Sequence, residues 1–397
     1  MDISSASYTD SLFSAMLAPS NGLEGLANAA LQRGIDAYTK QDYEGAVKEF
    51  KRSVGIGRGS SFAADAAQYL AMSYIQLEDT ENAIKAYESA FQIDPYRDDI
   101  RVTLGNLYFS QGKYEDARTE YAEAVRLNPS TANRYSLGQA YIELGRFSDA
   151  ETQYSAIQRL APQEAGGYLG MGLVYSRQDK HEEAIRQFQQ AISRDENLYD
   201  AYAQMGYSYA DMGDMESAQN MVDTLERLDQ ADLADTLSRY MYKVDPPKMM
   251  FAQSSSTFHF SLGKGMPLAA LNSYLTNPNA SKTLSIKIQF DKEMDRGSIE
   301  NPVNWHISRA IGQGPGQAYN FGLPLSPNEA KLPPMPSAVT WDADSLTATV
   351  YFTITQNAAS NATIDPSHVE FKFSGKDIYG QKMNPKFDQF SGFNNVA

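Results

Sequence analysis

The feature that most constrains this sequence is a pattern of small and aromatic residues that recurs about every 34 residues. Its clearest copy, Asp98–Pro129, reads as two short helices with a turn between them. The residues on the two apolar faces are Leu104, Gly105 and Tyr108, then Ala117, Tyr121 and Ala124. Gly112 ends the first helix and Pro129 stops the second. Such a hairpin is too small to bury its own apolar face, so it needs neighbours of the same kind.

The same residue types return in five further copies. They are Gly34, Tyr38, Ala46 and Phe50; Leu70, Ala71, Tyr74, Ala83, Tyr87, Ala90 and Pro95; Leu137, Gly138, Tyr141, Gly145, Ala150, Tyr154 and Pro162; Met171, Gly172, Tyr175, Ala184, Phe188 and Ala191; and Met205, Gly206, Tyr209, Gly213 and Ala218. The pattern resembles the tetratricopeptide repeat family. The six units are expected at 27–60, 64–97, 98–130, 131–164, 165–198 and 199–232.

One position departs from the family pattern. The first helix of a unit usually opens with a large aromatic residue, and Tyr168 and Tyr202 match this. Ala67, Arg101 and Arg134 do not. The resemblance implies an α-solenoid stabilised only as a stack, in which the first helices line a concave groove.

The repeats are flanked by two segments with apolar stripes. In residues 1–26 the stripe is formed by Leu12, Phe13, Met16 and Leu17. This leader is expected to cap the first repeat, or to act as a docking helix for another subunit. A stripe at 233–244, formed by Leu233, Leu237, Tyr240 and Met241, predicts a C-terminal capping helix.

Asp245-Pro246-Pro247 marks a boundary, because two prolines cannot continue a helix. Residues 245–281 are expected to hold a linker and a first strand. Alternating runs predict strands at Thr257–Leu262, Leu284–Phe290, Trp305–Ser308, Leu346–Thr355 and Val369–Phe373. Several short strands with long connections indicate an antiparallel β-sandwich.

Two motifs refine this prediction. One comprises Phe290, Lys292, Met294 and Asp295, and the other comprises Asp377, Gly380 and Met383. Together they resemble the bacterial Ig-like domains of surface-layer and adhesin-type proteins. The resemblance covers about 282–383, within a domain expected at 282–397. An inserted Gly/Pro-rich loop at 309–337 is either a crossover or a contact loop that uses Tyr319, Phe321 and Leu323.

The charge of this chain argues against a nucleic-acid partner. The formal net charge is −15, and the whole excess lies before Asp245, where 37 acidic and 22 basic residues occur. A nucleic-acid footprint needs a basic face. There is no Cys, which removes disulfides and Cys-ligated zinc. No apolar run is long enough to span a bilayer, so membrane insertion is not expected.

The sequence carries only weak signals for a catalytic, cofactor or metal site. The four His residues are scattered, and neither a G-x-S-x-G elbow nor a phosphate loop is present. Asp291, Glu293 and Asp295 could gather a hard cation, but alternation along a strand would place them on two faces. The glycines at Gly312, Gly314 and Gly316 are not followed by a helix. We therefore expect a non-enzymatic protein without a cofactor.

Binding of another protein in the groove of the repeats is a better hypothesis for the function than catalysis. The residues expected to face the groove are Gln68, Met72, Asn106, Phe109, Tyr135, Gln139, Leu173, Arg177 and Tyr207. Relatives that capture a C-terminal carboxylate use a Lys/Arg/Asn clamp, and the positions compared here hold Gln68, Val102, Tyr135 and Leu169. Aromatic and amide side chains suit a peptide segment or a neighbouring subunit.

The sequence favours an interaction scaffold, whose partner is another protein or a second copy of the chain. A self-assembling subunit of a bacterial surface layer or appendage is the alternative, and a carbohydrate- or surface-binding module is a third reading. The Ig-like resemblance favours a cell-surface, extracellular or periplasmic location. The N-terminus lacks the basic region of a secretory signal, which keeps a cytoplasmic location open.

Overall fold

The computed structural model describes residues 21–57, 59–60, 62–312 and 316–392. The chain divides into two compact units. We call Met1–Met212 with Asp223–Gln230 the helical unit, and Gly213–Val222 with Ala231–Ala397 the β unit. The predicted docking residues Leu12, Phe13, Met16 and Leu17 lie outside the described residues.

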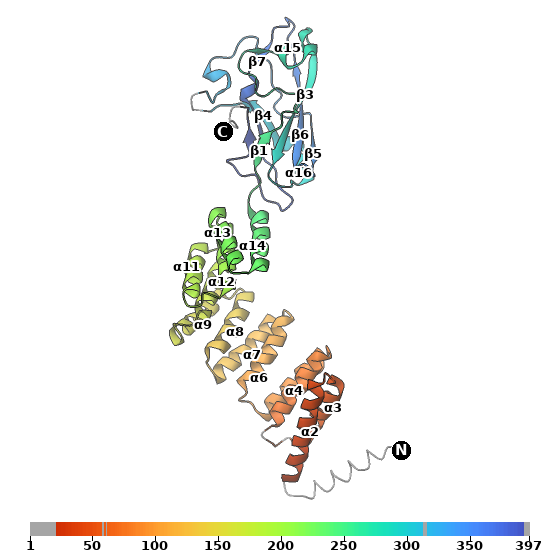
Figure 1. Ribbon diagram of the computed structural model, residues 1–397, viewed down its shortest axis with the longest axis vertical. Helices are drawn as coiled ribbons and strands as arrows, with labels where there is room; N and C mark the ends of the chain where they lie inside the picture. Colours follow the sequence, from red (N-terminus) through yellow and green to blue (C-terminus); the bar gives the residue numbers. More distant parts are fainter. Residues whose placement is uncertain (1–20, 58, 61, 313–315, 393–397) are drawn as a thin grey trace, which may run out of the picture. The chain divides into compact units, whose positions relative to one another are not determined.

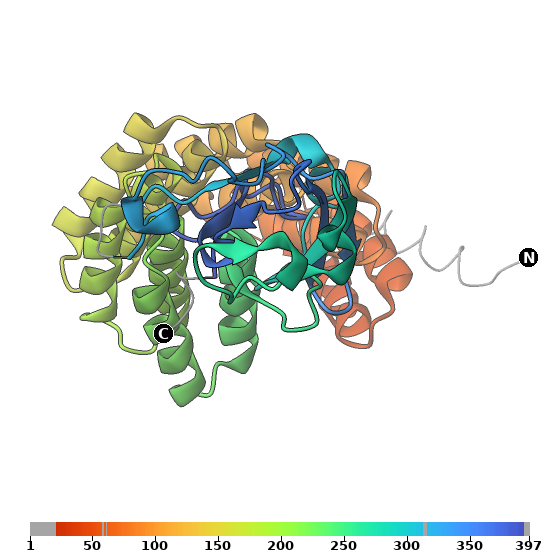
Figure 2. The same cartoon turned by 90° about the horizontal axis from the view of Figure 1, so that it is seen from above.

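Within the helical unit, the repeats form antiparallel helix pairs that follow one another around an arc (Figures 1 and 2). The helices are α2 (Asn21–Thr39), α3 (Tyr43–Ile56), α4 (Ala63–Gln76), α5 (Thr80–Ile93), α6 (Asp98–Ser110), α7 (Tyr114–Leu127), α8 (Thr131–Glu143), α9 (Phe147–Leu160), α10 (Gly166–Arg177), α11 (His181–Ile192), α12 (Tyr199–Asp211), α13 (Met215–Arg227) and α14 (Ala231–Val244). The tetratricopeptide-type helical prediction is thereby confirmed. Helix α2 begins at Asn21, six residues before the expected first repeat.

The turn inside each pair needs one residue in the left-handed backbone region. Gly112 (φ 72°) and Gly145 (φ 68°) supply it without steric cost. Glu78 (φ 59°) and Asp179 (φ 57°) adopt the same conformation in other repeats. The conformation is therefore set by the stacked pairs, and glycine is the residue that adopts it most easily.

Small residues in the first helices receive aromatic rings from the second helices. A Cβ on Gly105 would lie 2.5 Å from Cε1 of Tyr121, and one on Gly172 would lie 2.4 Å from Cε1 of Phe188. Both rings are buried. The recurring glycines are thus packing positions, because any side chain there would displace a ring from the core.

The β unit contains antiparallel strands around one core. Its elements are β1 (Met249–Ala252), β2 (Met266–Pro267), α15 (Leu268–Leu271), β3 (Ser281–Phe290), α16 (Arg296–Ile299), β4 (Trp305–Arg309), β5 (Ala338–Asp342), β6 (Thr347–Thr355), β7 (Thr363–Ile364), β8 (Val369–Phe373) and β9 (Gln389–Phe390). The sheet orders are β1-β3-β6-β5, β2-β7 and β4-β8-β9. Side chains of the four-stranded and three-stranded sheets share one hydrophobic cluster, which includes Phe290, Trp305, Phe352 and Phe371.

Four of the five predicted strands are confirmed, as β3, β4, β6 and β8. The strand predicted at Thr257–Leu262 is wrong. That segment lies along β3 through irregular bonds, in which the Phe258 N–H donates to the Ser285 carbonyl at 2.9 Å. Phe258 is fully buried. The alternation of apolar and polar residues therefore reflects burial of one side of the segment, although the segment does not form the regular hydrogen bonds of a strand. The antiparallel region is established, and its Ig-like identity stays a prediction.

The two Ig-like sequence motifs meet in space. Met294 and Asp377 form an isolated antiparallel bridge. Lys292 is 2% exposed, and its Nζ lies 3.7 Å from Oδ2 of Asp377. The same Nζ donates to the carbonyl of Tyr242 at 2.5 Å and to that of Asp245. Lys292 therefore donates hydrogen bonds to carbonyls at the C-terminal end of α14, where the carbonyls lack partners inside the helix.

Among the described residues, no helix is both long enough and apolar enough to cross a membrane.

Candidate interaction surface

All nine residues predicted to face the groove lie on first helices of the repeats. Gln68 and Met72 lie on α4, Asn106 and Phe109 on α6, Tyr135 and Gln139 on α8, Leu173 and Arg177 on α10, and Tyr207 on α12. We call the surface that they define the first-helix face. None of the nine is fully buried, so the face offers both apolar and amide groups.

Several of these side chains contact their own repeat. Asn106 Oδ1 accepts a hydrogen bond from the Tyr121 hydroxyl at 2.6 Å. The ring of Phe109 packs edge-on against Tyr114, with centroids 5.1 Å apart. These contacts fix the orientation of the side chains, which lowers the entropy cost of using them in binding.

The charges at one end of the face are arranged around a single guanidinium. Arg97 donates to Asp65 at 2.6 Å, to Asp99 at 2.7 Å and to Gln68 at 3.0 Å. The bonds to the two carboxylates, led by that to Asp99, raise the pKa of Arg97 further above its usual range. Gln68 is therefore committed to this cluster, which carries two carboxylates for one cation.

Tyr135 occupies the middle of the face. Its ring packs edge-on against Tyr154, with centroids 5.6 Å apart and planes at 71°. Burial raises the pKa of Tyr135, and the negative charge of Asp200 raises it further. Tyr135 thus lies in a partly buried position at which the charge of a carboxylate on α12 is also felt.

A depression of about 400 Å³ lies beside Tyr135. It is lined by Thr131, Ala132, Tyr135, Ser136, Ile157, Glu164 and Gly166. A Cβ on Gly166 would lie 3.8 Å from Cδ2 of Tyr135, so the missing side chain leaves the ring accessible. The small residues of α8 and α10 therefore open a space with an aromatic wall. We call it the Tyr135 depression.

Only Tyr135 of this lining was predicted from sequence. Ala132, Ser136, Gly166 and Glu164 were missed because each looks like an ordinary variable position within its own repeat. One signal was present, since the Gly166–Gly172 stretch contains four glycines. Glycine weakens a helix by about 1 kcal/mol relative to alanine, so such a density calls for a packing or surface reason.

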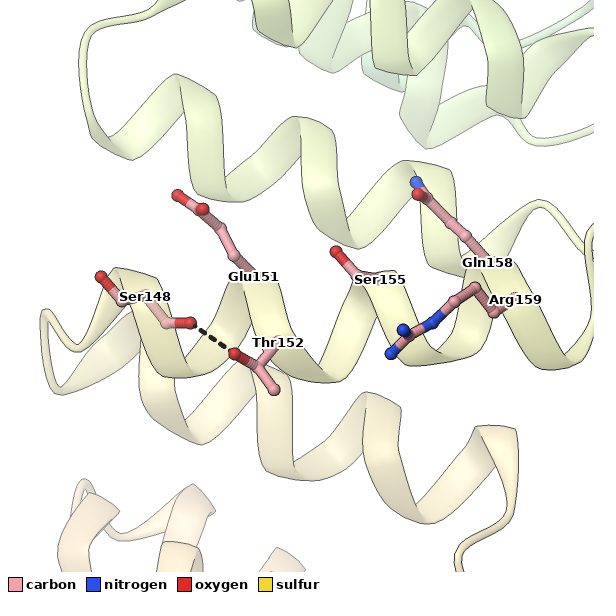
Figure 3. A pocket seen from close by; sticks show the side chains of 6 residues that line it. All are labelled: Ser148, Glu151, Thr152, Ser155, Gln158 and Arg159. Carbon is pink, nitrogen blue, oxygen red and sulfur yellow. Dashed lines mark hydrogen bonds between the residues drawn. The ribbon is translucent and has the colours of Figure 1, made fainter.

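A second depression, of about 490 Å³, runs along α9 (Figure 3). It is lined by Ser148, Glu151, Thr152, Ser155, Gln158 and Arg159. Thr152 donates to the Ser148 carbonyl at 3.0 Å, and Gln178 donates to Glu151 at 2.9 Å. The polar lining is largely engaged within the repeats, and we assign no chemistry to it.

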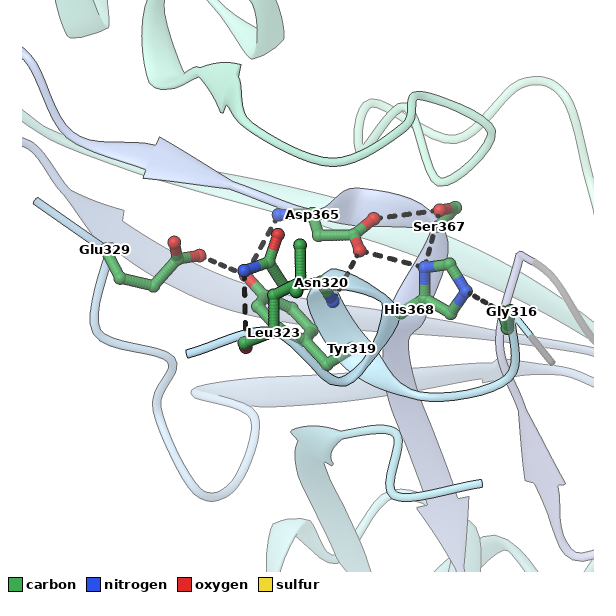
Figure 4. A network of polar contacts seen from close by, with 8 residues as sticks. All are labelled: Gly316, Tyr319, Asn320, Leu323, Glu329, Asp365, Ser367 and His368. Atoms are coloured by element: carbon green, nitrogen blue, oxygen red, sulfur yellow. Dashed lines mark hydrogen bonds and ion pairs between the residues drawn. The ribbon is translucent and has the colours of Figure 1, made fainter. Parts of the chain in front are cut away.

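The predicted contact loop has a buried anchor and exposed apolar residues. Tyr319 is buried, and its hydroxyl bonds Glu329 and accepts from the N–H of Asp365 at 2.9 Å (Figure 4). Phe321 and Leu323 are 48% and 56% exposed. Tyr319 therefore holds the loop in place, whereas Phe321 and Leu323 remain accessible.

The same network contains a serine, a histidine and an aspartate, but not in a nucleophilic arrangement. Nδ1 of His368 lies 2.9 Å from Asp365 Oδ2 and 3.0 Å from Ser367 Oγ, and Nε2 lies 2.6 Å from the Gly316 carbonyl. A catalytic serine must reach the imidazole nitrogen that does not contact the aspartate. Here both contact Nδ1, so the group ties the loop to the segment just before β8 and does not activate the serine.

Two of the three carboxylates considered for a cation accept hydrogen bonds from backbone N–H groups. Asp291 accepts from the Lys248 N–H at 2.8 Å, and Asp295 accepts from the Ser298 N–H at 2.7 Å at the start of α16. Burial raises the pKa of Asp291. The described ranges contain no group of three or more His, Cys, Asp or Glu residues that could hold a metal ion.

Comparisons with known proteins identify the repeats. Models described as tetratricopeptide repeat match residues 64–97, 102–165, 165–198 and 199–232. A curated relative, Hsp70-Hsp90 organizing protein 1 of Arabidopsis thaliana, is 30% identical over 112 residues. The match covers 27% of this chain and 18% of that protein, so the chain spans less than a fifth of the relative's length.

Solved structures match about half of this chain. A tetratricopeptide repeat protein from Parabacteroides merdae is 17% identical, with a TM-score of 0.46, and the match covers 55% of this chain and 93% of that one. PilF of Pseudomonas aeruginosa is 18% identical, with a TM-score of 0.42, and the match covers 55% and 98%.

Proposed function

We propose that this protein is a non-enzymatic interaction scaffold whose first-helix face holds a segment of another protein. The tetratricopeptide repeats support a role in protein–protein interaction. The observation that carries the proposal is the Tyr135 depression, because it is a space with an aromatic wall on a surface whose neighbouring side chains are held in fixed orientations. Peptide recognition needs such a site for an anchoring side chain.

The proposed ligand is not a C-terminal carboxylate held by a lysine clamp. The name of the Arabidopsis relative refers to Hsp70 and Hsp90. In this chain the compared positions are Gln68, Val102, Tyr135 and Leu169, without a lysine among them. An internal segment that presents an apolar anchor fits these residues better than a chain terminus does.

The β unit is proposed to be an Ig-like module that spaces the scaffold or adds a second contact. The meeting of the motifs at Met294 and Asp377 supports this proposal. The buried Lys292 connects the module to the end of α14 through backbone carbonyls. The module would thus be attached to the terminal helix by bonds that need no particular side chain on that helix.

Self-assembly is the second candidate, and one observation favours it. The loop of the β unit exposes Ile311, Phe321, Leu323 and Leu325, the first at 88%. Exposed apolar side chains that gather on one segment are typical of contact surfaces. Light scattering across a concentration series tests this candidate, since a strict monomer at all concentrations would contradict it.

A peptide-display library screened against the full chain tests the leading proposal. The enriched peptides should lose most of their affinity for a variant with Tyr135→Ala and Tyr207→Ala. A matched variant with Tyr96→Ala and Leu160→Ala removes exposed apolar side chains outside the first-helix face and should bind normally. Failure to enrich any peptide, or equal loss in both variants, would contradict the proposal.

A further inference from the structure

We propose that the partner segment is basic, with a large apolar anchor beside a lysine or arginine. This inference rests on the proposed function and names the partner for the same surface. The anchor would enter the Tyr135 depression, and its basic neighbour would pair with Asp200 and Glu164.

The lining of the depression sets the chemistry of the anchor. Tyr135 and Ile157 provide apolar walls, while Ala132, Ser136 and Gly166 contribute little bulk. The ring of Tyr135 is open towards Gly166, which makes it the contact surface for the anchor. About 400 Å³ is enough for a leucine or phenylalanine side chain, and burial of such a side chain is worth about 1.5–3 kcal/mol.

The charge around the depression sets the chemistry of the neighbouring residue. Glu164 lines the depression, and Asp200 contributes to the raised pKa of Tyr135. Both residues are exposed, and neither carboxylate has an ion-pair partner among the described residues. Two available carboxylates favour a cationic side chain.

Two arginines of the fifth repeat have contacts of their own. Arg194 stacks on the ring of Tyr168, with its Cζ 3.7 Å from the centroid, and donates to the Pro162 carbonyl at 2.8 Å. Arg177 pairs with Glu143 at 3.3 Å. Neither arginine pairs with Asp200 or Glu164 in these contacts, so both carboxylates stay available to a cation from the partner.

The same argument disfavours the chain's own leader as the occupant. Residues 1–20 carry Leu12, Phe13, Met16 and Leu17 as candidate anchors, but their charged residues are Asp2 and Asp10. A segment with carboxylates and no lysine or arginine does not complement the carboxylates of Glu164 and Asp200. The partner is therefore inferred to be a different protein.

A charge-swap experiment on the full chain tests the inference with peptides selected by display. The consensus should contain an aliphatic or aromatic residue close to Lys or Arg. Fluorescence anisotropy then measures the affinity of the selected peptides for two double variants. One carries Glu164→Lys and Asp200→Lys, and the control carries Glu88→Lys and Glu182→Lys. Glu88 and Glu182 are exposed acids on second helices. Reversal at the depression should weaken binding about tenfold, as expected for two exposed ion pairs.

Rescue and filling variants complete the test. A peptide with the Lys or Arg changed to Glu should bind the reversed chain better than the native one. Ala132→Leu should reduce binding by filling the depression, whereas Ala29→Leu, at another exposed helical alanine, should not. Both variants should keep native circular dichroism, because both sites are exposed.

The outcomes separate this inference from the proposed function. Peptides that lack a basic residue, or that bind the reversed chain unchanged while still depending on Tyr135 and Tyr207, would overturn the inference alone. Absence of any first-helix-face binder would overturn both.

Discussion

The ring of Tyr154 occupies the space that a side chain on Gly170 would need. A Cβ on Gly170 would lie 2.0 Å from Cε1 of Tyr154, which is fully buried. The same ring contacts Tyr135 on the first-helix face. The packing between repeats thus supports the wall of the depression.

Gly170→Ala should therefore destabilise the helical unit. The added methyl must displace a buried ring, at a cost of about 1–3 kcal/mol for overpacking. Gly25→Ala is the matched control, because Gly25 lies inside α2 with open space around its Cα. The control should gain about 0.5–1 kcal/mol from helix propensity. Urea unfolding followed by circular dichroism measures both, and equal midpoints would contradict the packing described here.

Removal of the hydroxyl should have opposite effects on the free energy of unfolding at two buried tyrosines. The Tyr87 hydroxyl is buried without a hydrogen-bond partner in the described part of the chain, whereas that of Tyr121 bonds Asn106. Tyr121→Phe should cost about 0.5–1.5 kcal/mol, and Tyr87→Phe should be neutral or stabilising. The free energies of unfolding of the two variants test this prediction. A larger loss of stability for Tyr87→Phe would contradict the hydrogen bonding described for the two hydroxyls.

The helical unit should lose stability in alkaline solution. Burial raises the pKa of Tyr87 and of Tyr121 to about 12. The folded state therefore holds these protons more tightly than the unfolded state, whose tyrosines titrate at about 10. The stabilisation is complete below pH about 10 and is lost as the pH rises towards about 12.

Tm measured from pH about 8 to about 11.5 tests this dependence. The decline should be shallower in Tyr87→Phe than in the native chain. A decline of equal slope in both chains would show that another group is responsible.

Lys292→Met should destabilise the β unit. The change removes a donor to the Tyr242 and Asp245 carbonyls and leaves the Asp377 carboxylate buried without its cation. Breaking a buried pair costs about 3–5 kcal/mol. Both tryptophans, Trp305 and Trp341, lie in the β unit, so fluorescence follows its unfolding selectively. Lys282→Met, at an exposed position of β3, is the control, and identical unfolding midpoints would reject the role of Lys292.

The repeats were predictable because each places the same contacts at the same spacing. Gly105 against Tyr121 and Gly172 against Phe188 are repeat contacts that sequence periodicity encodes. The wrong strand at Thr257–Leu262 shows the limit of alternation, since Phe258 is buried by side-chain packing and irregular bonds.

The Tyr135 depression was not predictable in the same way. It arises where small residues from different repeats coincide, Ala132 and Ser136 on α8 and Gly166 on α10. Asp200 comes from yet another repeat. Periodicity relates equivalent positions of repeats, whereas this site depends on residues that depart from the repeat pattern and meet only in the folded stack.

Hydrogen exchange of the full chain, with and without a display-selected peptide, tests the central claim most directly. The account predicts slower exchange in α8 and α10, which line the Tyr135 depression together with Ile157 of α9, and little change in α5 and α11, which contribute no residue to its lining. Protection confined to second helices or to the β unit would contradict binding at the first-helix face.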